Sequence, residues 1–317
     1  MKKNIILSFI LIISSILLVG CGSKKPEQIS LRDQGIFMME AGDYESALKN
    51  FNKALSLCPG RITDLEIDIC YYKAAAFNAL DMKEDAIAVY TSIINYNDKK
   101  FEPFFYRGSV YASMGEINKA IEDYDTAVSR NKDDYDLYIS IYQNLYALHF
   151  QDYANEYLDM ALDLGGKSDR DYFYRGKMYF LLQDYDNAVI ELGAAVSKGY
   201  PEAKVFLANV YRAMGDDANA SALLEDYISS DVATPEALGT MADIELASAN
   251  YESALSYYNA GLGFEDPDNI GQLLRGKAIC LEYLHQFTEA RNTLAEYLKL
   301  YPEDEDARRE MIFLATR

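Results

Sequence analysis

Residues 42–59 read GDYESALKNFNKALSLCP, and this stretch decides the fold. It begins with the turn signal Gly42-Asp43 and ends at Pro59, a residue that does not continue a helix. Between these ends the apolar residues recur three, four and seven positions apart: Tyr44, Ala47, Phe51, Ala54 and Leu55. Such spacing places them on one face of a helix, so the stretch predicts an amphipathic helix.

The same pattern returns along the chain at intervals near 34 residues. Its alanine recurs at steps of 39, 34, 34, 34, 32, 34 and 36, as Ala47, Ala86, Ala120, Ala154, Ala188, Ala220, Ala254 and Ala290. A large side chain follows each alanine by four positions: Phe51, Tyr90, Tyr124, Leu158, Leu192, Leu224, Tyr258 and Leu294. A small residue recurs upstream in the preceding segment: Gly35, Ala74, Gly108, Gly176, Ala208, Ala242 and Gly276. Because glycine costs a helix interior about 1 kcal/mol relative to alanine, we expect close approach of a partner helix there.

This order of small residue, aromatic residue, turn, alanine, aromatic residue, alanine and proline resembles the tetratricopeptide repeat. The resemblance implies an all-α fold, a right-handed superhelical solenoid of about eight helix-turn-helix repeats over residues 28–302. The chain departs from the family pattern in having no tryptophan, in carrying Tyr142 at one small position, and in replacing a closing proline by Gly165-Gly166. Residues 303–317 begin with four acidic residues and are expected to form a capping helix.

The first twenty residues have the character of a secretory signal. Lys2 and Lys3 precede a mainly apolar run over residues 5–19, which is shorter than the roughly 20 residues that a membrane span needs. The following Leu18-Val19-Gly20-Cys21 resembles the lipobox of bacterial lipoproteins. The resemblance implies a signal peptide over residues 1–20, cleavage between Gly20 and Cys21, a lipid on Cys21 and a tether over residues 21–27. It also implies a bacterial protein anchored on the extracytoplasmic face of the cell membrane. A plain signal peptide and an N-terminal membrane helix are the alternatives.

The composition argues against a nucleic-acid partner and offers little for catalysis. The formal net charge is −20, whereas nucleic-acid binding needs a basic face. The two histidines, His149 and His285, fall near predicted turns, where we expect ordinary solvated residues rather than zinc ligands. Cys58 and Cys70 are open to two interpretations, a disulfide or two thiols that pack as small apolar groups. We therefore expect no enzyme, no cofactor and no metal.

Binding residues are sought on the first helix of each repeat, because in this family that face lines the concave groove. The candidate groove residues are Tyr71, Asn78, Phe105, Phe173, Phe180, Asn209 and Arg212. Packing between successive first helices is the competing interpretation of the aromatic members. The function predicted is that of a lipid-anchored scaffold or adaptor that binds another protein or a peptide without catalysis. The alternatives are a cell-envelope enzyme, such as a peptidoglycan hydrolase with an unrecognised site, and a solute-binding lipoprotein of a transporter. The latter fold requires strands that alternate with helices, a pattern absent from this sequence.

Replacing Cys21 by alanine tests the anchor, because the lipobox resemblance implies that its thiol carries the lipid. We expect the Cys21→Ala chain to lose label from a fatty-acid probe and to be either uncleaved or released from membranes. Fractionation and probe labelling measure this. A variant that still takes up the probe and stays with membranes would contradict the lipoprotein interpretation.

Overall fold

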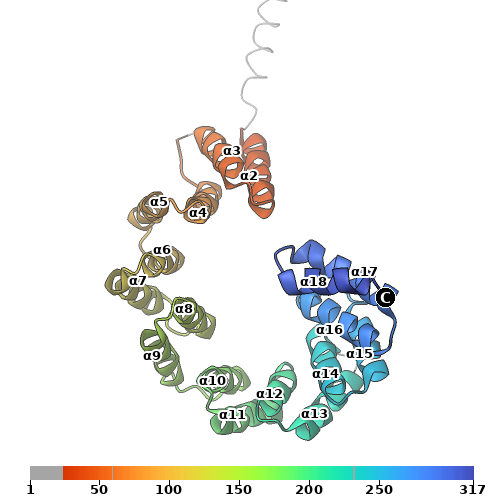
Figure 1. Ribbon diagram of the computed structural model, residues 1–317. Coiled ribbons are helices and arrows are strands. Elements are labelled where there is room, and N and C mark those ends of the chain that lie inside the picture. Colours follow the sequence, from red (N-terminus) through yellow and green to blue (C-terminus); the bar gives the residue numbers. More distant parts are fainter. Residues whose placement is uncertain (1–23, 59, 231–232) are drawn as a thin grey trace, which may run out of the picture. The chain divides into compact units, whose positions relative to one another are not determined.

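Helices account for all regular structure in the computed structural model, which describes residues 24–58, 60–230 and 233–317 (Figure 1). The first helices are α2 (Lys25–Glu40), α3 (Tyr44–Ser56), α4 (Asp64–Ala79), α5 (Lys83–Tyr96), α6 (Glu102–Ser113), α7 (Ile117–Arg130), α8 (Tyr135–Ala147) and α9 (Gln151–Leu162). They are followed by α10 (Asp169–Leu181), α11 (Tyr185–Ser197), α12 (Ala203–Ala213), α13 (Asp217–Ser229), α14 (Pro235–Ala247), α15 (Tyr251–Gly261), α16 (Ile270–Tyr283), α17 (Phe287–Leu300) and α18 (Glu305–Leu314). The predicted all-α repeat fold is confirmed. None of the described helices has the length and apolar character that a bilayer span requires. Gly20 and Cys21 lie outside the described residues.

The chain divides into two compact units, residues 1–159 and 160–317, with the boundary inside α9. Within the first unit α2 packs on α3, α4 on α5 and α6 on α7, while α2 also contacts α4 and α6 contacts α8. In the second unit the pairs are α10–α11, α12–α13, α14–α15 and α16–α17, and α10, α12, α14 and α16 contact one another in sequence. Each unit is therefore a stack of helix pairs. The repeat region begins with α2 at Lys25, three residues before the predicted start at residue 28. The predicted last helix is present as α18, which packs on α17.

The small residue of each first helix lies against the large residue of a second helix. All eight repeat alanines are fully buried, and each large residue four positions later is at most 4% exposed. A methyl group built on Gly176 would lie 2.5 Å from Leu192 Cγ, and one on Gly108 would lie 3.0 Å from the Tyr124 ring. Gly35 bears the same relation to Phe51. Glycine at these positions is therefore explained by contact between helices, as the sequence predicted. Gly276 differs, because its neighbour is Tyr258 of the preceding pair.

The turn between the two helices of a pair has one conformation throughout the chain. A residue with positive φ recurs at the repeat spacing, as Gly42, Asp81, Gly115, His149, Gln183, Gly215, Ala249 and His285, with φ between 57° and 78°. This left-handed residue ends the first helix, as at His149, where the following amide of Phe150 donates to the carbonyl of Leu145 at 2.9 Å. Both histidines are thus exposed turn residues, as predicted.

Three first helices contain an Arg-Gly pair, Arg107-Gly108, Arg175-Gly176 and Arg275-Gly276, and in the first two the arginine bonds to the second helix of the same pair. Arg107 donates from Nε and Nη2 to both carboxylate oxygens of Asp123 on α7, at 2.8 and 2.7 Å, and from Nη1 to Thr91 Oγ1 on α5 at 2.9 Å. Arg175 Nε likewise donates to Glu191 Oε2 on α11 at 2.9 Å. In the last pair the position equivalent to Asp123 is Thr293, and Arg275 instead pairs with Glu310 of α18. That ion pair fastens the final helix to the stack.

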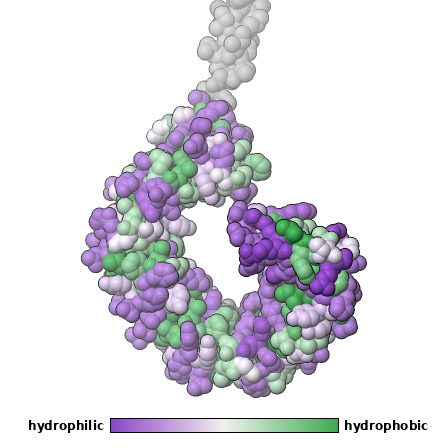
Figure 2. All heavy atoms as spheres, in the orientation of Figure 1, coloured by the Kyte–Doolittle hydropathy of each residue, from purple (hydrophilic) through white to green (hydrophobic). Residues whose placement is uncertain are grey.

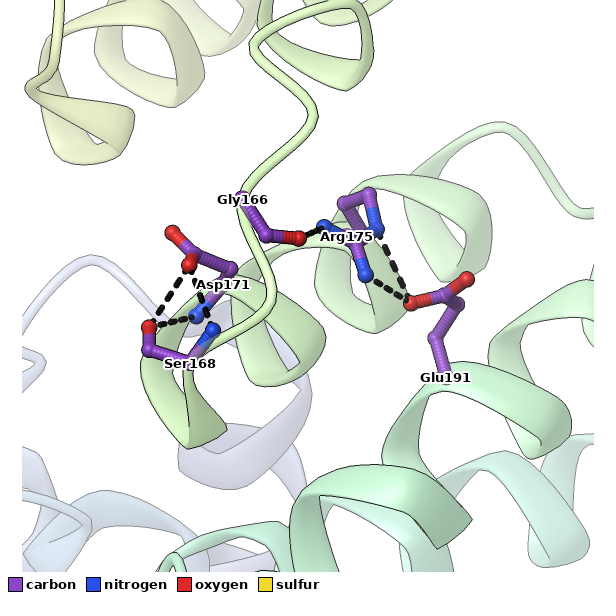
Figure 3. A network of polar contacts seen from close by, with 5 residues as sticks. All are labelled: Gly166, Ser168, Asp171, Arg175 and Glu191. Atoms are coloured by element: carbon purple, nitrogen blue, oxygen red, sulfur yellow. Dashed lines mark hydrogen bonds and ion pairs between the residues drawn. The ribbon is translucent and has the colours of Figure 1, made fainter.

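The paired glycines before α10 are explained by a cap and an arginine (Figure 3). Ser168 and Asp171 bond reciprocally, the Asp171 amide to Ser168 Oγ at 3.1 Å and the Ser168 amide to Asp171 Oδ2 at 2.7 Å. A side chain on Gly166 would overlap the Asp171 carboxylate, and Gly165 has a φ of +69°. Arg175 Nη1 then donates to the Gly166 carbonyl at 2.6 Å. The chain passes here too closely for any larger residue.

The pair α10–α11 allows a matched test of the helix contact. Gly176→Ala should destabilise the protein by about 1–3 kcal/mol, because its methyl group meets Leu192. Gly193→Ala on α11 should instead stabilise it by about 0.5–1 kcal/mol, because nothing lies within 4 Å and alanine favours the helix. Urea unfolding followed by circular dichroism measures both. Equal effects of the two substitutions would show that the contact at Gly176 does not limit helix approach.

Candidate binding surface

The first unit has a hollow of about 550 Å³ formed mainly by α4 and α6 with Tyr90 of α5. We call it the tyrosine pocket. Its lining residues are Asp68, Tyr71, Tyr72, Ala75, Asn78, Ala79, Tyr90, Glu102, Tyr106, Ser109 and Val110. The volume lies within the range of ligand pockets, which accept a group the size of a long side chain with ease.

Three tyrosine rings of this pocket contact one another. The Tyr71 and Tyr106 rings lie 5.7 Å apart in an edge-to-face arrangement, and Tyr90 stacks on Tyr106 at 5.8 Å. Tyr90 is 4% exposed and Tyr106 is 43% exposed. Tyr90 therefore forms the buried side of the cluster, while Tyr106 is the member exposed to solvent. Mutual ring contacts fix the side chains in place before any ligand arrives.

The two carboxylates of the pocket differ in their partners. Asp68 Oδ2 accepts from Arg32 Nη1 of α2 at 3.0 Å, which neutralises its charge. Glu102 lies in the first turn of α6, where the helix dipole favours a negative charge. Its Oε2 atom is buried and has no hydrogen-bond donor among the described residues. Burial, followed by the nearby charge of Glu102, raises the pKa of Tyr71 well above its ordinary value.

The second unit has a hollow of about 490 Å³ formed mainly by α12 and α14, which we call the Arg212 pocket. Its lining residues are Phe180, Phe206, Asn209, Arg212, Ala213, Asp217, Asp243, Ile244 and Ala247. The Phe180 and Phe206 rings meet edge to face at 5.5 Å. The apolar and polar parts of the pocket thus lie side by side, with aromatic rings from α10 and α12 next to an arginine.

Asp243 organises the polar part of the Arg212 pocket. Its Oδ1 accepts from the Tyr258 hydroxyl at 2.5 Å, and its Oδ2 accepts from Gln272 Nε2 at 2.8 Å. Arg212 Nη2 lies 3.5 Å from the same carboxylate. Burial, followed by the hydrogen bond to Asp243, raises the pKa of the Tyr258 hydroxyl. Asn209 accepts from Thr240 Oγ1 at 3.3 Å, so its amide is oriented as well.

Five of the seven candidate groove residues line these pockets, Tyr71 and Asn78 in one and Phe180, Asn209 and Arg212 in the other. Phe173 requires a correction. It is 8% exposed and belongs to the core of the second unit, because Tyr200 from the α11–α12 connection stacks on it at 4.5 Å. Phe105 lines neither pocket and is half-buried against Tyr106 and Tyr124.

Several residues that line the pockets were not predicted from the sequence. Tyr72, Tyr106 and Phe206 lie one residue after the repeat position that Tyr71, Phe105 and Phe173 share, and Asp68 and Glu102 lie three residues before it. Both sets follow the repeat spacing, so the same register extended to neighbouring positions would have found Tyr106 and Glu102.

The described residues hold no group of histidine, cysteine and acidic side chains that suits a metal ion. Cys58 and Cys70 are both free thiols. Burial raises the pKa of Cys70, as expected for a packed thiol rather than a reactive one.

Residues 105–134 match the tetratricopeptide repeat family. The match covers most of α6 and all of α7, the pair that contains Gly108, Ala120 and Tyr124. A 111-residue stretch is 26% identical to sperm-associated antigen 1A of Danio rerio, and this covers 34% of the chain and 26% of that relative's length.

Solved structures resemble the chain over a larger part of its length. The crystal structure of the Cut9–Hcn1 hetero-tetramer of the APC/C matches 93% of this chain and 70% of its counterpart, with a TM-score of 0.50 and 11% identity. A tetratricopeptide repeat protein from Parabacteroides merdae matches 80% of this chain and 98% of its own, with a TM-score of 0.49 and 19% identity. At such identities the likeness concerns the fold alone. The helix pairs, with the likeness to Cut9–Hcn1, place the chain among all-α repeat structures.

Removing the Asp243 carboxylate tests the network that orients the Arg212 pocket. Asp243→Ala should cost about 1–3 kcal/mol, because the fully buried Tyr258 loses its hydrogen-bond acceptor. Asp226→Ala removes a carboxylate that is 64% exposed and pairs with Lys204, so it should cost at most about 1 kcal/mol. Thermal unfolding measures both. A loss at Asp243 no larger than the loss at Asp226 would show that the network contributes nothing to stability.

Proposed function

We propose that this chain is a lipid-anchored scaffold or adaptor that binds a segment of another protein on the surface of its first helices, without catalysis. The observation that carries the proposal is the presence of two pockets on these helices, each with aromatic rings beside a few oriented polar groups. Aromatic side chains bind with little loss of rotamer entropy, and polar groups fix the register of a bound segment.

The architecture of the pockets favours a polypeptide over a small metabolite. Both pockets are open hollows on helix pairs, and their polar atoms lie beside apolar walls. In Figure 2 the visible surface is mainly hydrophilic, with hydrophobic residues scattered among polar ones. An extended segment can place alternate side chains in such hollows while its backbone stays near solvent.

We further propose that the chain is anchored to a membrane through the lipobox-like Gly20-Cys21. A diacylated Cys21 would provide the two acyl chains that stable anchoring requires. Because α2 begins at Lys25, only three residues separate Cys21 from the first helix. The repeat units would then lie close to the outer face of a bacterial membrane, within reach of envelope proteins rather than of nucleic acid.

Crosslinking in cells followed by mass spectrometry tests the proposal on the lipidated chain. The doubly substituted Phe180→Ala, Arg212→Ala chain should capture its partner at least about tenfold less, as expected when an aromatic anchor and a charged group are both lost. The control chain carries Ile190→Ala and Arg291→Ala, two exposed positions of the same unit outside the pocket. Circular dichroism verifies that both chains fold.

Two outcomes would contradict the proposal. Undiminished capture by the folded pocket variant would place binding on another surface. Failure of the unsubstituted, membrane-bound chain to crosslink to any other protein would show that it is not a scaffold.

A further inference from the structure

The tyrosine pocket joins aromatic ring faces to a carboxylate that lacks a partner. Tyr106 offers an exposed ring on one side, and Tyr71 and Tyr90 contact it from the other elements of the pocket. Glu102 contributes the buried Oε2 atom that receives no hydrogen bond from any described residue. Glu102 lines the pocket, and a positively charged group next to its carboxylate stabilises that charge.

The charges around the pocket leave an excess of negative charge. Asp68 is paired with Arg32, so it does not attract a further cation strongly. A smaller hollow of about 230 Å³ adjoins the pocket, shares Asp68, Tyr71 and Glu102 with it, and adds Asp64 and Lys100. Two cations thus face three carboxylates in a chain whose net charge is −20. Of the two carboxylates that line both hollows, Asp68 is paired with Arg32, and Glu102 has an oxygen that receives no hydrogen bond from the described residues.

We propose that the tyrosine pocket binds an arginine side chain of the partner segment. The inference rests on the proposed scaffold function and names the chemistry that its partner presents. A guanidinium group is planar, so it stacks on the exposed ring of Tyr106 while its edge donates to the carboxylate of Glu102. An ammonium group of lysine has no plane to stack and a stronger hydration shell, so it fits less well. Asn78, exposed at the same pocket, is positioned to bond the backbone of the segment that carries the arginine.

Fluorescence anisotropy with short labelled peptides tests the inference on the purified full-length chain. The probes are nonapeptides of glycine and serine with one central residue, which is arginine, lysine or citrulline. Citrulline has nearly the shape of arginine but no charge. We expect the arginine peptide to bind at least about tenfold more tightly than the citrulline peptide and more tightly than the lysine peptide, since the carboxylate contact is charge-assisted.

Matched variants locate the binding in the pocket. Glu102→Gln keeps the side-chain shape and should weaken binding of the arginine peptide about tenfold, and Tyr106→Ala should weaken it severalfold. Glu84→Gln and Tyr153→Ala are the controls, because Glu84 also lies in the first turn of its helix, α5, and Tyr153 is a similarly exposed ring outside the pocket. Neither control should change the affinity.

Three outcomes would overturn the assignment. They are equal affinity for the arginine and citrulline peptides, unchanged affinity in the folded Glu102→Gln chain, and tighter binding of the lysine peptide than of the arginine peptide. The result is separable from that of the crosslinking experiment. Partner capture that survives Glu102→Gln would refute the arginine pocket and leave the scaffold proposal intact. Arginine-peptide binding by a chain that captures no protein would refute the scaffold proposal and leave the arginine pocket intact.

Discussion

The contact between a small residue on one helix and a large residue on the next sets the distance between the two helices. Where glycine or alanine faces Phe51, Tyr124 or Leu192, two helices approach until backbone and side chain touch. A larger residue would separate them, and each later pair would be displaced in turn. The hydrogen bonds of Arg107 and Arg175 then hold α6 and α10 against their partner helices and against the segments before them. A regular stack follows from these two interactions.

The same contact determines where ligands are able to bind. Burial of one face of a first helix against its partner leaves the opposite face to neighbouring first helices and to solvent, and both pockets form there. Their side chains stand on helices whose positions are fixed by packing, so the pockets exist without a ligand. The tyrosine pocket and the Arg212 pocket share this origin but differ in chemistry. One contains an unpaired carboxylate beside tyrosine rings, and the other contains an arginine bound to Asp243.

Most of the fold was predictable because it depends on residues that recur at fixed intervals. The pattern of Ala47 and Phe51 recurs in every later pair and predicts it. The exposure of His149 and His285 follows from their place in the turn between two helices. The pockets were predictable only in part. Tyr71, Phe105 and Phe173 occupy one repeat position, yet Tyr71 lines a pocket, Phe105 packs on Tyr124, and Phe173 is covered by Tyr200. Tyr200 lies in a connection between helices, and periodicity carries no information about where a connection folds. Whether a donor lies next to Glu102 Oε2 likewise depends on how the helices pack, which the repeat pattern does not specify.

The distance along the chain between contacting residues has a consequence for how the protein forms. Gly35 meets Phe51, Gly108 meets Tyr124, and Gly176 meets Leu192, each across the same short interval of sequence. Contacts of such low contact order form early, since little loop-closure entropy is lost in making them. A helix pair can therefore nucleate anywhere in either unit and extend to its neighbours. A chain of this kind does not need its whole length before it begins to acquire structure, so folding can follow the chain as it emerges.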